Sequence, residues 1–127
     1  RRVALDLLDG VWAVARLAPD TPIPDWLPRD GALVSVTRTA EELSLVCPEE
    51  AVPRGVRTER GFRCLVVRGP LAFSEIGILA ALARPLAEAG VSLFALSTFD
   101  TDFLLVPARG LDRAVEALRR AGHVVAG

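Results

Sequence analysis

The order of hydrophobic patterns in residues 62–125 constrains the fold of this chain more than any other feature. Four apolar runs are typical of strands, at residues 62–69, 91–98, 102–107 and 123–125. A helical spacing of apolar residues separates the first two runs, and another separates the last two. The predicted order is strand, helix, strand, strand, helix, strand, which is the split βαβ pattern of ferredoxin-like domains. The sequence therefore predicts an α+β fold with antiparallel sheets.

Both predicted helices carry start or stop signals. Ser74 is the expected N-cap of the first helix, and Gly90 is expected to end it. Its apolar face consists of Leu79, Leu82, Ala83 and Leu86. Pro85 is expected to kink this helix because proline removes one backbone hydrogen bond. The second helix ends near Gly122, and its apolar face consists of Leu111, Ala114, Val115 and Leu118.

Strand and turn signals also fill the start of the chain. Residues 3–8 and 11–17 suit strands, and the Asp9–Gly10 pair between them predicts a β-hairpin. Residues 19–31 carry four prolines, which break the segment into turns with room for one short helical turn. We expect Trp26 to order this segment.

The next two apolar runs, residues 32–39 and 43–48, predict a second pair of strands. The polar stretch 49–61 contains one proline and two glycines and is the clearest internal boundary. We therefore expect an N-terminal unit over residues 1–59 and a C-terminal domain over residues 60–127.

An internal repeat relates the two halves. Residues 35–46 align without gaps on residues 95–106, which sets Glu42 opposite Asp102. A second match has an offset of 52 residues, so the first half is shorter where the second half has its long helix. This pattern predicts two related units, of which the first is trimmed.

The composition excludes several kinds of chemistry. All 15 Lys-or-Arg positions are arginine, and lysine, asparagine, glutamine, tyrosine and methionine are absent. The sequence therefore offers no lysine for a Schiff base or a phosphate loop and no N-glycosylation acceptor. A formal net charge of −1 argues against nucleic acid or an anionic membrane as the main partner.

Few side chains suggest catalysis or metal binding. Cys47 and Cys64 fit neither a metal-ligand spacing nor a CxxC motif, and we expect buried free thiols in a cytoplasmic protein. His123 is the only plausible base near neutral pH, and we expect it on the solvent side or at a helix end. The apolar window 76–83 is too short to span a bilayer, and residues 1–10 lack the continuous apolar core of a signal peptide.

The loop before the first predicted helix carries polar residues that suit a ligand. Ser74, Glu75 and Gly77 surround the helix start, where backbone N–H groups can bind an anion. Gly77 has no Cβ to hinder a ligand that approaches the backbone. A purely structural explanation stays open, in which Ser74 caps the helix, Glu75 complements its dipole and Gly77 packs against a strand.

The second polar loop, residues 97–103, crowds two carboxylates and three hydroxyls between apolar strands. Asp102 begins a strand, and a carboxylate there can accept charge-assisted hydrogen bonds from an amine or a guanidinium. Turn chemistry is the alternative explanation, and it suits Asp100 better than Asp102.

These features together resemble an ACT domain. The stretches SVTRTAEELSLVCPE (35–49) and FALSTFDTDFLLV (94–106) are similar to small tandem ACT proteins related to the CASTOR arginine sensors and to aspartate kinase regulatory domains. The resemblance covers nearly the whole chain, with a first ACT unit that is degenerate. It implies amino-acid binding between ACT units in a homodimer, without catalysis and without a cofactor.

The resemblance also implies which residues line the ligand site. From the helix-start loop these are Glu75, Ile76, Gly77 and Ile78. Thr98 and Phe99 would offer main-chain carbonyls, and Asp102 would meet a cationic or amine group. Ser92 and Leu93 would face the same site from a neighbouring ACT unit.

Three functions are compatible with the sequence. The first is a non-catalytic amino-acid sensor with a regulatory role, in which a bound ligand shifts a population of states. The second is an ACT interaction module whose pocket stays empty and which contacts an unidentified protein partner. The third is a small enzyme that uses Glu75 and Asp102 as an acid and base pair. It has the least support of the three, because the sequence offers few carboxylates for such a site.

Overall fold

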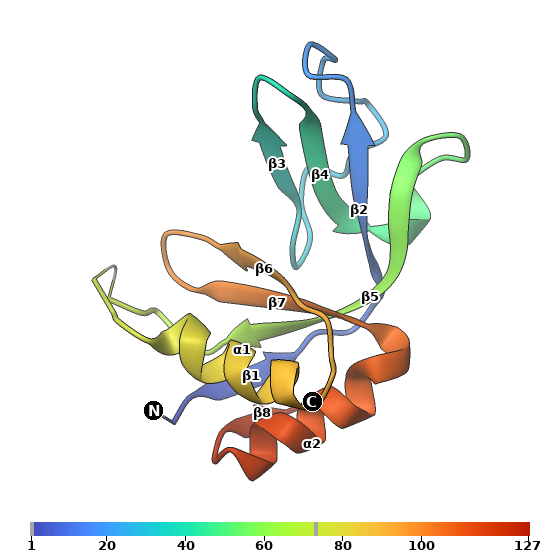
Figure 1. The fold of residues 1–127 in the computed structure, drawn as a ribbon. Coiled ribbons are helices and arrows are strands. Elements are labelled where there is room, and N and C mark those ends of the chain that lie inside the picture. The colour runs from blue at the N-terminus through green and yellow to red at the C-terminus, as the bar shows by residue number, and fades with distance from the viewer. Residues whose placement is uncertain (1, 73) are drawn as a thin grey trace. The chain divides into compact units, whose positions relative to one another are not determined.

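The computed structural model describes residues 2–72 and 74–127 (Figure 1). Its longer elements are β1 (Ala4–Leu7), β2 (Trp12–Leu17), β3 (Ser35–Arg38), β4 (Leu43–Pro48), β5 (Arg57–Val67), α1 (Ile78–Glu88), β6 (Phe94–Ser97), β7 (Asp102–Pro107), α2 (Leu111–Arg120) and β8 (Val124–Ala126). Two short 3₁₀ helices, η1 (Glu49–Ala51) and η2 (Ala108–Gly110), follow β4 and β7. The order of strands and helices predicted for residues 62–125 is confirmed.

The chain forms two compact units, and they are not consecutive segments. One unit combines Arg1–Asp9 with Arg63–Gly127, and the other is Gly10–Phe62. The observed units differ from the expected division at residue 59 mainly because the first nine residues group with the C-terminal part of the chain. Strand β5 starts in one unit and ends in the other.

The sheet of the first unit gains a strand from the start of the chain. Its order is β6-β7-β5-β1-β8, in which β1 pairs antiparallel with β5 and parallel with β8. The expectation of wholly antiparallel sheets is therefore wrong at the β1–β8 pair. Leu5, which is fully buried, lies opposite Val67 on one side and Val125 on the other, so β1 brings an apolar side chain to the middle of the core.

Helices α1 and α2 cover one face of this sheet (Figure 1). The core between the sheet and these helices contains Leu5, Leu65, Val67, Ile78, Leu82, Leu86, Leu104, Val106, Ala114, Leu118 and Val125. The strand residues in this set alternate along the sequence, as expected for one face of a pleated sheet. Burying a leucine such as Leu82 stabilises the fold by about 2 kcal/mol.

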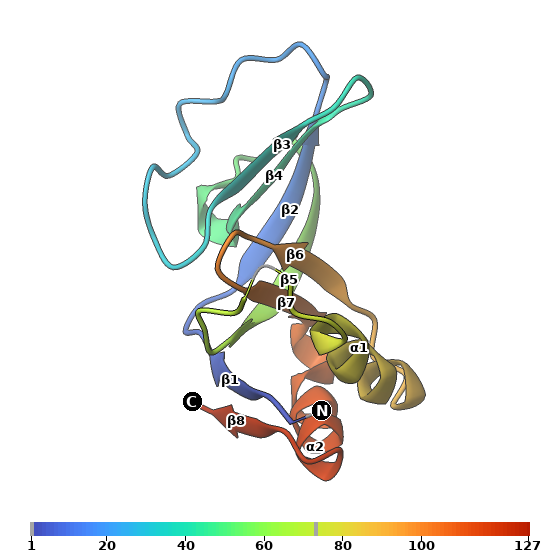
Figure 2. The ribbon, with the colours of Figure 1, turned by 90° about the vertical axis from the view of Figure 1, so that its left-hand side faces the viewer.

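The second unit covers its sheet without an α-helix. Residues 10–62, all of them described, contain β2, β3, β4 and the first part of β5. The long loop over residues 18–34 supplies Trp26, Leu27 and Val34 to a second apolar cluster (Figure 2). The strand residues in that cluster are Ala13, Ala15, Leu43, Leu45 and Cys47. The loop consists of turns and irregular backbone, as its prolines predict, and one turn is closed by a hydrogen bond from the Leu27 N–H to the Pro24 carbonyl at 3.2 Å.

The predicted hairpin at Asp9–Gly10 is wrong. Strand β1 pairs with the end of β5, where Leu7 lies opposite Leu65, and β2 pairs with its beginning, where Trp12 lies opposite Phe62. The chain therefore continues along β5 and does not reverse. The same pairing starts β5 at Arg57, five residues earlier than predicted, because its first residues are held by β2.

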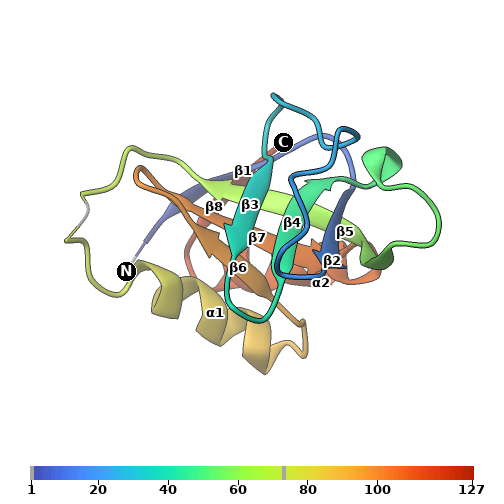
Figure 3. The ribbon, with the colours of Figure 1, turned by 90° about the horizontal axis from the view of Figure 1, so that it is seen from above.

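The hairpins β3–β4 and β6–β7 share the same kind of turn, each in its own unit (Figure 3). The Thr39 N–H donates to the Glu42 carbonyl at 2.9 Å, and the Thr98 N–H donates to the Thr101 carbonyl at 2.8 Å. Each threonine hydroxyl also accepts a hydrogen bond from the N–H three residues later. These hydrogen bonds set Glu42 opposite Thr101, so the predicted alignment of Glu42 with Asp102 is off by one residue. Such a shift exchanges the two faces of a strand.

His123 is not on the solvent side, because its side chain is 5% exposed. Its Nδ1 accepts a hydrogen bond from the Val3 N–H at 3.0 Å, which leaves Nε2 as the protonated nitrogen. Nε2 lies 3.0 Å from the Ala81 carbonyl oxygen. The Ala81 carbonyl lacks its helical backbone donor, because the residue four positions later is Pro85, which has no N–H. The helix continues through Pro85 to Glu88, with His123 in place of the missing backbone donor.

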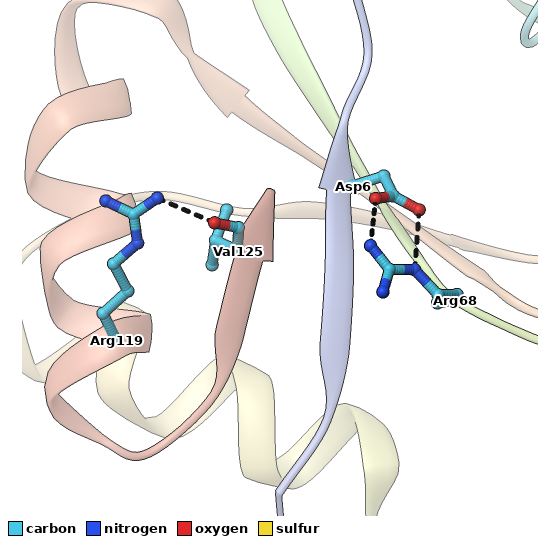
Figure 4. A network of polar contacts seen from close by, with 4 residues as sticks. All are labelled: Asp6, Arg68, Arg119 and Val125. Atoms are coloured by element: carbon cyan, nitrogen blue, oxygen red, sulfur yellow. Dashed lines mark hydrogen bonds and ion pairs between the residues drawn. The ribbon is translucent and has the colours of Figure 1, made fainter. Parts of the chain in front are cut away.

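Two arginine side chains connect β1 and β8 to neighbouring elements (Figure 4). Arg68 donates two hydrogen bonds to the Asp6 carboxylate, and Arg119 donates to the Val125 carbonyl at 2.7 Å. The hydrogen bond from Arg68 lowers the pKa of Asp6 from its ordinary value. The Asp6 carboxylate therefore stays charged at a lower pH than it does in the unfolded chain.

The cysteine prediction is confirmed, since Cys47 and Cys64 are buried free thiols. Burial raises the pKa of Cys64 to about 12 and also raises the pKa of Cys47. Over the described ranges, no helix is long and apolar enough to cross a membrane.

Candidate functional site

A pocket of about 370 Å³ opens between the start of α1 and the β6–β7 turn. These two segments lie side by side in Figures 1 and 3. The lining residues all belong to one unit and are Leu71, Ala72, Glu75, Gly77, Ile78, Leu79, Ala80, Ser97, Thr98, Phe99, Asp100, Thr101 and Asp102. Two loops that are far apart in the sequence therefore form a single site.

The start of α1 lines this pocket with Gly77, Ile78, Leu79 and Ala80. Gly77 is the N-cap, with a φ of +84° and no side-chain cap. The prediction that Ser74 caps the helix is wrong, because the helix begins four residues later at Ile78. A Cβ on Gly77 would meet no atom within 4 Å, so glycine is required by its left-handed backbone and not by packing against a strand. The N–H groups of a first helical turn lack intrahelical acceptors and attract negative charge.

The β6–β7 turn carries the polar side of the pocket. Ser97 and Asp102 lie opposite each other in the hairpin, and the Ser97 hydroxyl donates to Asp102 Oδ1 at 2.6 Å. Asp102 is half-buried, whereas Phe99 is 80% exposed at the tip of the turn. The serine therefore fixes one carboxylate oxygen of Asp102 in a defined direction.

The charged residues that line the pocket are all acidic. They are Glu75, Asp100 and Asp102, and no arginine is among the described lining residues. Carboxylates in a partly enclosed site favour cationic ligands. The arrangement as a whole suits a molecule with a carboxylate at one end, facing the helix start, and positive charge elsewhere.

Six of the nine predicted site residues line this pocket. They are Glu75, Gly77, Ile78, Thr98, Phe99 and Asp102. Ile76 is 87% exposed beside the pocket, Ser92 is exposed, and Leu93 packs against the core below the helices. Phe73, the residue before Ser74, lies outside the described residues.

The sequence analysis missed several lining residues, and Ser97, Thr101 and Leu71 matter most. Ser97 could have been found from the hairpin register, because the pair that closes a four-residue turn faces the same side of the sheet. Leu71 had no signal of its own, because it reaches the pocket through a contact with a turn about thirty residues later. Its N–H donates to the Asp100 carbonyl at 2.7 Å.

Metal or base chemistry has little support among the described residues. No group of three or more His, Cys, Asp or Glu side chains is arranged to hold a metal ion there. His123 does not line the pocket, and contacts with Val3 and Ala81 occupy both of its ring nitrogens.

The family of the chain follows from its match to known proteins. A family model described as ACT domain matches residues 57–120. This chain belongs to the ACT domain family. A second family model, of an N-terminal domain, matches residues 10–55 of this ACT domain protein. The resemblance found in the sequence and the α+β fold class are therefore confirmed.

Solved structures agree with this assignment. The ACT domain protein is 40% identical to protein Atu0741 from Agobacterium tumefaciens, with a TM-score of 0.92 over 98% of this chain and 92% of that chain. The ligand-free regulatory subunit of aspartate kinase from Thermus thermophilus has the same fold, with a TM-score of 0.66 and 13% identity over 96% of this chain and 99% of that one.

The Homo sapiens protein named cytosolic arginine sensor for mTORC1 subunit 1 is 47% identical over 51 residues. This segment is 40% of the ACT domain protein and 16% of the human protein. The chain therefore matches a small share of the length of that relative.

Proposed function

We propose that this ACT domain protein is a non-catalytic regulatory protein that binds an amino acid with a positively charged side chain. The observation that carries the proposal is a pocket with a helix start on one side and only acidic charged side chains in its described lining. The similarity to a protein named as an arginine sensor supports the same ligand class.

Each part of the ligand has a counterpart in the pocket. The first-turn N–H groups of α1 bind the α-carboxylate, and Gly77 lets that group approach the backbone. Asp102, oriented by Ser97, accepts hydrogen bonds from the cationic group. The main-chain carbonyls of Thr98 and Phe99 accept hydrogen bonds from the ligand's N–H groups.

A second copy of the chain completes the site. Ile76 and Phe99 are large apolar side chains that are 87% and 80% exposed beside the pocket opening, and a partner surface would cover them. Ser92 and Leu93 do not line the pocket of their own unit, so in this proposal they face the pocket of the partner. A ligand held between two copies stabilises the arrangement that fits it, which is the regulatory step.

The proposal includes a duplication in the sequence, with a degenerate ACT-like unit over residues 1–59 and an ACT domain over residues 60–127, although residues 1–9 group with the C-terminal part in the folded chain. The shared turn of the β3–β4 and β6–β7 hairpins supports it, since Thr39 and Thr98 make equivalent hydrogen bonds. Among residues 10–62 no described pocket corresponds to the acidic one. One amino acid per chain is therefore the expected stoichiometry.

Thermal unfolding in the presence of each of the twenty amino acids tests the proposal. A ligand at a hundred times its dissociation constant adds about 2.7 kcal/mol to the free energy of unfolding, which gives a measurable rise in Tm. We expect a rise with arginine and with no acidic amino acid, together with a dimer mass in light scattering. The absence of any rise at millimolar concentrations would contradict the proposal.

A second candidate is an interaction module whose pocket takes no ligand. The exposed apolar side chains of Ile76, Leu79 and Phe99 favour it, because they lie at one place on the surface and could bind a protein directly. A dimer that does not respond to any amino acid would be the result expected for this function.

A further inference from the structure

The β6–β7 turn is attached to the segment that follows β5. The Thr101 hydroxyl donates to the Val67 carbonyl at 2.6 Å. The Leu71 N–H donates to the Asp100 carbonyl at 2.7 Å. Leu71, Asp100 and Thr101 line the acidic pocket, so the Leu71–Asp100 hydrogen bond joins two lining residues, and the Thr101–Val67 hydrogen bond attaches the turn to the end of β5.

Gly69 allows the two segments to come this close. A Cβ at this position would lie 3.1 Å from the Leu71 nitrogen and 3.2 Å from the Asp100 carbonyl oxygen. Both are backbone atoms, which cannot move aside as the end of a flexible side chain can. An alanine at position 69 would therefore push the turn away from the strand end.

The Thr101 side chain is not needed to form the turn itself. The turn of the β3–β4 hairpin makes the same internal hydrogen bonds with Glu42 at the corresponding position. In both turns these bonds use the backbone of the fourth residue and the hydroxyl of the first. The Thr101 hydroxyl is thus committed to a contact outside its own hairpin.

We propose that Thr101 and Gly69 are positioning residues that hold the β6–β7 turn, which is one wall of the pocket, against the segment after β5 in the position the ligand requires. The proposal rests on the proposed function, because it concerns the same site. A wall that is fixed before binding does not have to be ordered by the ligand, which raises affinity. The loss of either contact leaves the turn intact and lowers the fraction of molecules with a formed pocket.

The experiment compares Thr101→Val, Thr101→Ser and Gly69→Ala with the wild-type full chain. The first readout is the amide exchange rate of Leu71, and the second is the dissociation constant for L-arginine. Thr101→Val should speed up Leu71 exchange and weaken arginine binding, each by about tenfold. Gly69→Ala should act in the same direction, whereas Thr101→Ser should stay close to the wild type because it keeps the hydroxyl.

Two control variants separate positioning from general stability. Thr58→Val removes a similar hydrogen bond, from the Thr58 hydroxyl to the Val56 carbonyl at 2.8 Å, in the unit that does not hold the pocket. Gly110→Ala adds a Cβ that would lie 3.8 Å from its nearest neighbour, an ordinary contact. Neither should change arginine affinity, even where the urea midpoint moves as far as it does in Thr101→Val.

The outcomes distinguish this inference from the function on which it rests. No saturable binding of arginine to the wild type would defeat the proposed function and this inference with it. Normal binding to Thr101→Val, unchanged Leu71 exchange in that variant, or equal weakening by Thr58→Val would overturn the positioning role alone. Weak binding by Thr101→Val with recovery in Thr101→Ser would support it.

Discussion

Residues 63–127 cover their sheet with two α-helices, whereas residues 10–62 cover theirs with a proline-rich loop. A helix satisfies most of its backbone hydrogen bonds internally, but a loop needs a separate donor for each buried carbonyl. In the second unit side chains donate to the loop backbone: the Trp12 indole donates to the Leu33 carbonyl in the interior at 3.0 Å, and Arg38 donates to the Pro19 carbonyl at the surface. A unit without α-helices can therefore keep its core if side chains supply donors to the loop backbone.

The largest expected effect tests whether the two cores are equally rigid. Leu82→Ala removes a fully buried side chain below α1 and should lower the free energy of unfolding by about 3 kcal/mol. Leu27→Ala in the loop-covered core should cost about 2 kcal/mol, because a loop can relax into the space more easily than a helix. Urea unfolding measures both. Equal losses would contradict the difference in rigidity.

The helix-covered unit also uses side-chain donors, and His123 is among them. His123→Ala removes the ring nitrogens that contact the Val3 N–H and the Ala81 carbonyl. It should lower the free energy of unfolding by about 2 kcal/mol. In a Pro85→Ala background the new N–H can donate to Ala81, so the same substitution should cost about 1 kcal/mol less. A double-mutant cycle in urea measures this coupling. Purely additive effects would show that His123 does not replace the donor that Pro85 lacks.

Trp12→Phe tests the side-chain donors of the loop-covered unit. This substitution keeps most of the apolar contact and removes the indole N–H that donates to the Leu33 carbonyl. The free energy of unfolding should therefore fall by about 1 kcal/mol. Amide exchange within residues 18–34 should become faster than in the wild type, while exchange in α1 and α2 stays the same. Faster amide exchange throughout the protein would mean that the indole N–H stabilises the whole protein and not the loop alone.

Asp102→Ala tests the pocket and should leave stability nearly unchanged, because the residue is half-buried at the start of a strand. Arginine affinity should fall by at least about tenfold, the scale of one lost charge-assisted hydrogen bond. The matched variant is Glu42→Ala, which removes a half-buried acid from the corresponding turn of the other unit. Calorimetric titration of both measures the difference. Similar affinities in the two variants would remove Asp102 from the site.

The smallest effect concerns the ion pair between Asp6 and Arg68. The folded-state pKa of Asp6 is lowered by its hydrogen bond with Arg68, so this contribution to stability is complete above the unfolded pKa of about 3.9. It is lost as the pH falls through the folded pKa. Urea midpoints at pH 6 and pH 3 should therefore differ slightly more for the wild type than for Asp6→Asn. An identical difference would show that the exposed pair adds nothing measurable.

Local patterns in the sequence were enough to predict the helix-covered half. The strands and helices of residues 62–125 follow from periodicity and glycine or proline signals, and the second hairpin follows from its turn residues. Partners that are distant in the sequence were not predictable in this way. The Asp9–Gly10 signal was misread because only the pairing with β5 reveals that the chain continues forward.

The candidate site shows the same limit. The polar loops around Glu75 and Asp102 were found because polarity in a short apolar context is visible in one dimension. The role of Leu71 depends on a hydrogen bond to Asp100, and that of Gly69 depends on the space left by the turn. Contacts between loops leave no periodic trace, so they needed the three-dimensional structure.

The place of β1 between β5 and β8 also affects how the protein is made. Val3 and His123 are 120 residues apart in the sequence, yet they are joined by a hydrogen bond. On the ribosome β1 emerges before residues 124–126 and must wait for them before both of its edges are covered. Until then it offers an unpaired edge to other chains, so molecules interrupted during synthesis are the ones most exposed to aggregation.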